Sequence, residues 1–477
     1  MKNSHEYLRF YIFLVLFGCL NLKAHIGNSP NAILHFNLHK HANMQLNWDS
    51  EIAAIRQLRV SQAYGDPLYT KFAPSSLIRF YGFTGFAMGT VTRQVVEAFN
   101  IASYLFPAPY LPDVIDRDIN AHALTFLEAN GARLGIFLNP IAQNTQANIY
   151  GLLEMDFSGI EPETAYIAKI RHAFGEIIWH NGAFLFGQYY HPLFLRNCFP
   201  RTVNYNMGAP YEPQALVPQV RVSQRFSMIE LTLTAAGEAY IKSWGPFLTQ
   251  TVGQVQSLVF IQNAIVPNWN LEFKWLFENT GFVGWSFDYK RLVPRLVSFN
   301  NFKVSEHIDS VIAEVFSHNV FYWGQLNCKV VYSQNGSDQL LISGFAVDTV
   351  DPITDYRTYS NTAAFSGWLD IYTVFFYDLM TAGLFVGGTV NLGASHALYT
   401  DPTSNQPIVY ALDGLAQLLA HSVRVSPRFS YGRNAFRFGI ELTWDLAAFG
   451  TLDDHARVID AIPVNAFSYL VSIDYVF

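Results

Sequence analysis

The last eleven residues of the chain, 467–477, alternate between two kinds of side chain. The odd-numbered positions are all aromatic or aliphatic: Phe467, Tyr469, Val471, Ile473, Tyr475 and Phe477. The even-numbered positions include Ser468, Ser472 and Asp474. Because strand side chains point alternately to the two faces of a sheet, we expect a strand with one wholly apolar face. Such a strand is typical of a β-barrel wall between lipid and water, although the edge strand of a soluble sandwich shows the same alternation.

The composition favours the barrel. Hydrophobic residues make up 51% of the 477 residues and aromatic residues 16%, whereas only 14% are charged, against about 25% in a typical soluble domain. The aromatic excess suits the girdles of a barrel at the lipid–water interface. A soluble chain of this length would divide into two or three domains, whereas one barrel accommodates it without linkers. The net charge of −7 gives no indication of a nucleic-acid partner.

The amino terminus predicts export. Residues 10–20 are apolar but too few to span a bilayer, and residues 22–24 offer a cleavage site. We therefore expect a signal peptide at 1–24, although residues 16–19 also resemble a lipoprotein box. Residues 25–75 would then form a short irregular or helical periplasmic segment.

Metal or cofactor sites are not expected. His35, His39 and His41 lie in the periplasmic segment, but no carboxylate or thiol stands at ligand spacing, so an unstructured leader is the preferred interpretation. Cys198 and Cys328 are too far apart in sequence to indicate a disulfide scaffold or a zinc site.

From residue 76 to residue 477 the chain reads as a series of barrel strands. The expected strands are 76–88, 124–138, 146–157, 165–179, 183–190, 219–226, 228–236, 270–277, 282–291, 307–316, 321–332, 365–376, 381–391, 422–431, 435–445 and 467–477. They predict an all-β, transmembrane antiparallel β-barrel of about 16 strands (range 14–18), wide enough for an aqueous channel. The apolar run 371–390 is interpreted as two strands meeting near Asp378, not as a helix.

Two features would shape the lumen. The Pro- and Asn-rich stretch 191–218 is unusually long for a loop without function, so we expect it to fold inward and narrow the pore. Strand faces carrying arginine must point into the lumen, because each Arg facing lipid at the midplane costs ~2–4 kcal/mol. The candidate lining residues are Lys169, Arg171, Arg196, Arg201, Arg221, Arg225, Arg424, Arg428 and Arg437, with Glu154 and Asp156 as the opposite pole. Such arginines either favour anions or only pair with neighbouring carboxylates, and both interpretations stay open.

Several motifs, in this order, resemble the DcaP-like trimeric outer-membrane porin family. They are Ala132-Arg-Leu-Gly-Ile-Phe137, Gly151-Leu-Leu-Glu-Met-Asp-Phe157, Ile170-Arg-His-Ala-Phe174, Phe186-Gly-Gln-Tyr189, Thr202-Val-Asn-Tyr205 and Pro218-Gln-Val-Arg-Val222. The resemblance covers residues 77–230 and the terminal strand. It implies a sixteen-stranded homotrimer, an inward loop after the fifth strand and a preference for small anions such as dicarboxylates. Arg171, Arg221 and Arg225 carry over best, Arg196 and Arg201 less directly. Family members often carry an amino-terminal coiled coil, whereas residues 25–75 lack sustained heptads.

The expected protein is therefore a porin for passive diffusion of small hydrophilic, anionic solutes, and not an enzyme. It would lie in the outer membrane of a diderm bacterium, in contact with its lipid, after insertion by the barrel assembly machinery. A receptor or adhesin barrel without transport is the main alternative. A barrel enzyme is less favoured, because Ser395 and His396 are adjacent but no spacing marks a catalytic triad.

Overall fold

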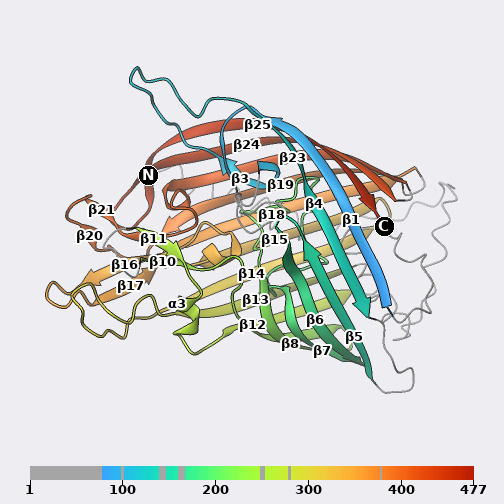
Figure 1. Cartoon of the computed structure of the whole chain (residues 1–477), viewed down its shortest axis with the longest axis horizontal. Coiled ribbons are helices and arrows are strands. Elements are labelled where there is room, and N and C mark those ends of the chain that lie inside the picture. Colours follow the sequence, from blue (N-terminus) through green and yellow to red (C-terminus); the bar gives the residue numbers. More distant parts are fainter. Residues whose placement is uncertain are drawn as a thin grey trace, which may run out of the picture. The chain divides into compact units, whose positions relative to one another are not determined.

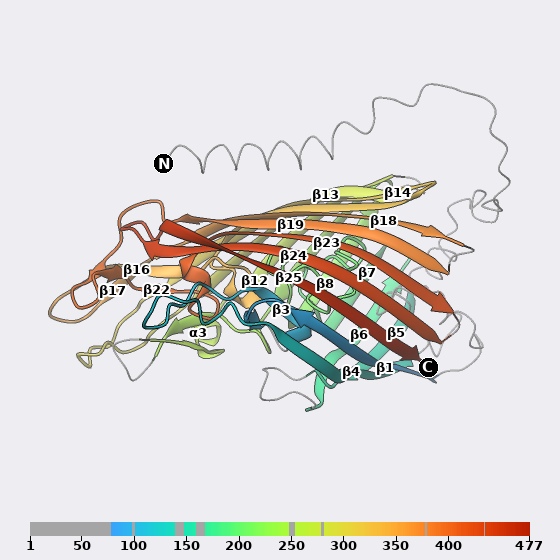
Figure 2. The same ribbon diagram turned by 90° about the horizontal axis from the view of Figure 1, so that it is seen from above.

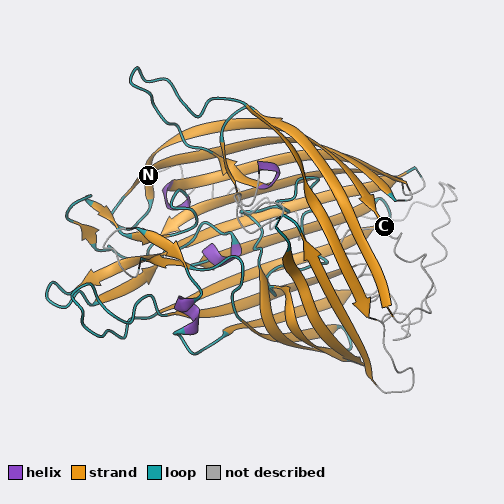
Figure 3. Cartoon of the chain, in the orientation of Figure 1, coloured by secondary structure: helices purple, strands orange, loops and turns teal. Residues whose placement is uncertain are grey.

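The computed structural model describes residues 78–97, 101–138, 147–158, 167–247, 253–277, 281–376, 379–433 and 435–477. They belong to one compact unit that begins at Ile78. The expected signal peptide, the segment 25–75 and its three histidines lie outside the described residues. Within them, strands dominate and the few helices are single short turns (Figure 3).

The unit is a closed antiparallel barrel of sixteen strands (Figure 1). The strands are β1 (Ile78–Val91), β4 (Leu124–Leu138), β5 (Ala147–Asp156), β6 (Lys169–Trp179), β7 (Gly182–Tyr190), β8 (Leu216–Phe226), β9 (Ile229–Ala236), β12 (Asn268–Phe277), β13 (Gly281–Leu292), β14 (Ile308–Phe321), β15 (Gly324–Gln334), β18 (Ala363–Phe375), β19 (Met380–Gly393), β23 (Leu419–Arg433), β24 (Phe436–Leu452) and β25 (Val458–Val476). Each pairs with the next, and β25 closes the barrel on β1, with Phe83 opposite Val476. Each expected strand corresponds to one barrel strand, so the fold prediction is confirmed.

The terminal strand has the two faces that its alternation predicts. Phe467 and Tyr475 are 59% and 41% exposed on the outside of the barrel, whereas Ser472 is 5% exposed on the inside. Outward aromatic side chains gain contact with lipid, and the small or polar side chains turn inward.

One strand boundary differs from the sequence expectation, and one ambiguous run agrees with it. Strand β8 begins at Leu216, so the loop before it ends at 215 and not at 218. Pro218 lies inside β8 opposite Gln188, and its carbonyl accepts a hydrogen bond from Gly237 at 2.9 Å. The run 371–390 does form two strands, β18 and β19. Among the described residues, none of the helices is long and apolar enough to cross a membrane.

The two ends of the barrel differ. At the end that holds the carboxyl terminus, the fully described connections 180–181, 227–228 and 322–323 are short hairpins, whereas the long described connections lie at the opposite end (Figure 2). We call the latter the mouth end; in outer-membrane barrels the long loops are the extracellular ones. The connections carry β2 (Val95–Glu97), β3 (Tyr104–Pro107), β10 (Trp244–Pro246), β11 (Gln254–Gln256), α3 (Val259–Gln262), β16 (Phe345–Val350), β17 (Arg357–Asn361), β20 (Thr400–Asp401), β21 (Gln406–Pro407) and β22 (Val409–Tyr410). Single 3-10 turns lie at Ile101–Ser103, Ser337–Gln339 and Ala416–Leu418.

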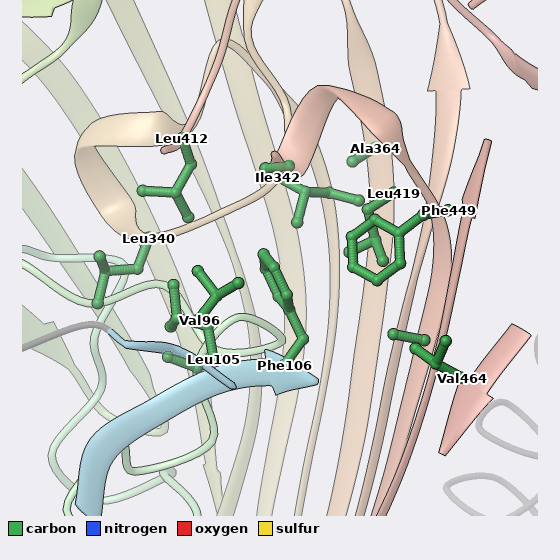
Figure 4. Close-up of a cluster of buried hydrophobic side chains, with 13 residues drawn as sticks. Val96, Leu105, Phe106, Leu340, Ile342, Ala364, Leu412, Leu419, Phe449 and Val464 are labelled. Carbon is green, nitrogen blue, oxygen red and sulfur yellow. The ribbon is translucent and has the colours of Figure 1, made fainter. Parts of the chain in front are cut away.

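A large apolar cluster lies between these connections and the wall. Phe106 of β3 packs in one cluster with Leu340 and Ile342, which follow β15, and with Phe449 of β24 (Figure 4). Burial of such side chains stabilises each by roughly 1.5–3 kcal/mol. The connections at the mouth end are therefore part of the packed interior.

Candidate pore and its lining

Residues 191–215, here called the inward loop, join β7 to β8 and cross the lumen. Asn197 is the only exposed residue of this loop. The loop reaches strands far from β7 in the barrel order. For example, the Val203 amide donates a hydrogen bond to Glu441 Oε2 of β24 at 2.6 Å. These contacts hold the loop inside the barrel.

Tyr205 marks the far point of the inward loop. Its hydroxyl donates to Asp474 Oδ1 of β25 at 3.2 Å, and Asp474 also pairs in register with Arg437 of β24. The approach requires small neighbours, because a Cβ on Gly85 or Gly131 would lie 2.8 Å from the Tyr205 hydroxyl oxygen. Glycine at these two wall positions makes room for the tip of the loop.

Glu212 anchors the returning half of the inward loop. Its Oε1 accepts from Lys329 Nζ of β15 at 2.9 Å, and its Oε2 accepts from Trp368 Nε1 of β18 at 2.7 Å. Lys329 also lies 3.3 Å from Glu314 of β14, and the three charged side chains are fully buried. Burial raises the pKa of Glu212 to about 7, although Lys329 and Trp368 act in the opposite direction.

Arg424 of β23 lies beneath the inward loop. Its Nε contacts Asp445 Oδ1 at 2.7 Å, and its terminal nitrogens donate to the carbonyls of Leu105 at 2.7 Å and Ala209 at 3.0 Å. The residue is 2% exposed. One side chain thus ties the wall to β3 and to the inward loop.

Arg428 and Arg201 meet at one carboxylate. Arg428 binds both oxygens of Asp370, at 2.6 and 3.0 Å. The backbone amide of Arg201 donates a hydrogen bond to the same carboxylate at 3.2 Å. The Arg201 guanidinium lies over the Tyr372 ring, 4.9 Å from its centroid. Among the described residues, no carboxylate lies within ion-pair distance of the Arg201 side chain.

A second charged group lies on β5 and β6. Arg171 binds Glu154 at 2.7 Å and approaches Asp156 at 3.6 Å, while Lys169 lies 3.5 Å from Asp156. The pairing shifts register after Glu154, which stands opposite His172. This bulge turns both Arg171 and His172 toward the lumen, which strict alternation does not predict.

Three arginines gather around two tyrosines of β7. Arg196 of the inward loop donates to the Tyr189 hydroxyl at 2.9 Å. Arg221 of β8 lies 5.6 Å from the Tyr189 ring and donates to the Tyr190 carbonyl at 3.0 Å. Arg171 lies 4.9 Å from the Tyr190 ring. We call Arg171, Arg196 and Arg221 the arginine cluster.

Arg225 and Arg133 lie farther along the same part of the wall. Arg225 bonds to the Ser227 carbonyl at 2.8 Å, next to the β8–β9 turn. Arg133 of β4 lies 4.0 Å from Asp156 and was missed in the sequence analysis. It occupies the second position of the first motif, where the strand alternation would have placed it on the inner face.

A second buried segment was also missed. Residues 335–344, here called the mouth loop, follow β15 and are buried throughout. Leu341 belongs to the same apolar cluster as Leu193 of the inward loop. The backbone amide of Gln214 donates a hydrogen bond to the backbone carbonyl of Gln339 at 2.9 Å. The mouth loop therefore packs on the inward loop, a contact between segments more than a hundred residues apart that local pattern does not reveal.

The Ser395–His396 pair lies among the connections of the mouth end. Ser395 Oγ is 3.1 Å from His396 Nδ1, and His396 Nε2 is 2.9 Å from Asp348 Oδ1 of β16. The His396 side chain is 52% exposed. The three residues form a hydrogen-bonded string at the surface, remote from the arginine cluster in the barrel order.

No protein-family model matches the chain, and no curated protein matches it. Among solved structures, the outer membrane channel DcaP of Acinetobacter baumannii is similar, with a TM-score of 0.58 and 15% identity over 84% of this chain and 97% of that one. This chain has the DcaP fold. An outer membrane protein of Vibrio cholerae, OmpT in its trimer form, and the anion-selective porin from Comamonas acidovorans each have a TM-score of 0.47 and 8% identity, over 84% of this chain. The matched region covers 100% of the OmpT chain and 99% of the Comamonas porin chain.

The likeness to DcaP agrees with the topology expected from the motifs. In this DcaP-like barrel, β7 is the fifth wall strand in chain order, and the inward loop follows it directly. Of the three arginines that the resemblance favoured, Arg171 and Arg221 lie beside the stem of that loop, whereas Arg225 lies next to the β8–β9 turn.

Proposed function

We propose that this protein is an outer-membrane porin through which small hydrophilic solutes, preferentially anions, diffuse passively. The arginine cluster carries the proposal. Its three guanidinium groups stand beside the stem of the inward loop, whereas the loop's anchors lie on β15, β18, β23, β24 and β25. The solute path would therefore run along β4 to β8.

The charge balance of this part of the wall favours anions. Arg133 and Lys169 join the arginine cluster, and Glu154 and Asp156 are the carboxylates that pair with them. The same strands carry two further carboxylates, Glu128 of β4 and Glu176 of β6, and Glu176 is 2% exposed. With Arg225 included, six cations face four carboxylates among the described residues of β4 to β8 and the stem of the inward loop. The excess of positive charge attracts anions without binding them tightly. Arg424 and Arg428, in contrast, are neutralised by Asp445 and Asp370.

Planar bilayers test the proposal. Purified protein should give stepwise conductance, and in a salt gradient its reversal potential should have the sign of anion preference. Arg196→Ala with Arg221→Ala should shift that potential toward cations. Arg428→Gln should shift it less, because Asp370 already neutralises this arginine. An absence of conductance from folded, heat-modifiable protein would contradict the proposal.

A receptor barrel without transport is the second candidate. The buried mouth loop favours it, because a segment folded over the entrance restricts passage. The same bilayer recording separates the two functions, since a receptor barrel stays silent at every voltage and pH.

The proposal includes a homotrimer in the outer membrane, inserted by the barrel assembly machinery after removal of a signal peptide. The outward aromatic face of β25 supports insertion into lipid. Native mass spectrometry of detergent-extracted protein should give three chains. Amino-terminal sequencing of the mature protein should start at His25.

A further inference from the structure

One lysine of the wall binds the mouth loop directly. Lys290 of β13 directs its Nζ to Asp338 Oδ1 at 2.5 Å and to the Asn335 carbonyl at 2.6 Å, both in the mouth loop. The same nitrogen lies 3.2 Å from Ser243 Oγ, in the connection between β9 and β12. A single ammonium group therefore joins two connections to the wall.

The site holds more negative than positive groups. Glu238 of the β9–β12 connection accepts bonds from the amide and hydroxyl of Ser243 at 2.9 and 2.7 Å. Asp288 shares the inner face of β13 with Lys290. Asp338, Glu238 and Asp288 are each 6% exposed or less. Three buried carboxyl groups thus lie in the neighbourhood of one ammonium, of which only Asp338 contacts it among the described residues, and they cannot all ionise without strong repulsion.

His191 adds no compensating charge at neutral pH. His191 belongs to the inward loop, and its Nε2 lies 3.7 Å from Asp288 Oδ1. Burial lowers its pKa to about 3, and Arg221 and Lys290 act in the same direction, so the imidazole is neutral. Burial and the neighbouring Asp338 raise the pKa of Glu238 to about 7. Lys290 outweighs burial at Asp338 and lowers its pKa.

With the mouth loop packed inside the barrel, several buried polar atoms of this site lack hydrogen-bond partners among the described residues. Asp288 Oδ1, His191 Nε2, Asn335 Oδ1 and Ser337 Oγ are buried and have no hydrogen bond among the described residues. Water would satisfy these atoms if the mouth loop moved out, so burying them opposes the apolar contacts that hold it in. These unpartnered atoms offset part of the stability that the apolar contacts give the mouth loop, whereas Glu212 of the inward loop uses both of its oxygens.

We propose that the mouth loop is a proton-controlled gate over the pore entrance, folded in while Glu238 is protonated and released when Glu238 ionises. This inference rests on the proposed channel function. The direction follows from the raised pKa of Glu238: opening releases a proton between pH 4.5 and about 7, so the folded-in form is favoured at low pH and loses this advantage progressively up to about pH 7. One proton released on opening changes the ratio of open to closed channels by up to about tenfold per pH unit.

Single-channel recording of the full chain between about pH 4.5 and about pH 8 tests the gate. The wild type should conduct more at high pH. Glu238→Gln, which cannot ionise, should stay at the low-pH level throughout. Asp454→Asn, a change at an exposed carboxylate of the mouth end, should respond like the wild type. Glu212 titrates in the same range, so a response that persists in Glu238→Gln would overturn the assignment.

A disulfide tests the movement itself. The Gln214–Gln339 backbone bond brings the two loops close enough for Gln214→Cys with Gln339→Cys. Cys198 and Cys328 would be changed to Ser so that one disulfide forms. The oxidised channel should hold the low-pH conductance until a reductant restores the response. If the oxidised channel responds to pH as the wild type does, the gate proposal is wrong. If the folded barrel shows no conductance at any pH, the proposed channel function is wrong instead.

Discussion

Lys329 of β15 and Glu212 of the inward loop form a fully buried ion pair at 2.9 Å, although 117 residues separate them in the chain. Each comes from a segment whose local pattern says nothing of the other. Their contact fixes the returning half of the inward loop against the wall, where Trp368 supplies a further hydrogen bond.

Removing the lysine should be far more damaging than neutralising the glutamate. Lys329→Met leaves Glu212 and Glu314 buried without their cation, and loss of one partner in a buried pair costs about 3–5 kcal/mol. Glu212→Gln keeps the Lys329–Glu314 contact and an oxygen for Trp368. The temperature at which the folded band converts on gel electrophoresis should therefore fall much more for Lys329→Met. Equal losses would mean that the pair is not the anchor.

Arg424 should prove a structural arginine of the inward loop. Arg424→Lys keeps the charge near Asp445 but loses bonds to carbonyls, at ~1.5–3 kcal/mol each for a charged donor. We expect faster proteolysis within residues 191–215 and a larger conductance. Arg291→Met is the matched control, because the Arg291–Asp309 pair is exposed and such pairs contribute little. If Arg424→Lys only alters ion selectivity, the residue lines the pore instead.

Gly131 should tolerate a side chain better when Tyr205 lacks its hydroxyl. In Gly131→Ala the new Cβ meets the Tyr205 hydroxyl at 2.8 Å, and overpacking of this kind costs roughly 1–3 kcal/mol. Thermal unfolding should show a smaller cost of Gly131→Ala in a Tyr205→Phe background. Additive effects of the two changes would show that Tyr205 does not occupy the space over Gly131.

Ser395 should not act as a nucleophile. The Ser395–His396–Asp348 string is solvent-exposed, and water weakens the electrostatic interactions that a hydrolase needs. A fluorophosphonate probe should label wild-type protein no more than the Ser395→Ala variant. Specific labelling that is lost in both Ser395→Ala and His396→Ala would establish a serine hydrolase site.

Local pattern predicted the wall well, because each strand faces lipid on one side. Charged side chains are excluded from that side, so alternation in β8, β23, β24 and β25 assigns the faces independently of distant residues. The same rule fails where the pairing shifts register, as at the β5–β6 bulge, where Arg171 and His172 both face inward. A bulge arises from the pairing of two strands, which neither strand encodes alone.

The lining was predicted as residue types and not as partners. Arg171, Arg221, Arg424 and Arg428 lie on the inner face of the barrel, but their neighbours differ, and their role in lining a pore stays a prediction. Arg428 and Arg424 have carboxylate partners on adjacent strands, whereas Arg221 stacks on Tyr189. Which arginines keep a net field for an ion depends on cross-strand register, which alternation does not specify.

The amino-acid sequence by itself determined the barrel, its sixteen strands and which side chains face lipid, because those properties repeat every two residues. Only the tertiary structure decided how the lumen is filled. The inward loop and the mouth loop are placed by contacts between segments far apart in the chain, such as Glu212 with Lys329 and Asp338 with Lys290. Such contacts depend on the closed barrel bringing opposite walls together, so no local period records them.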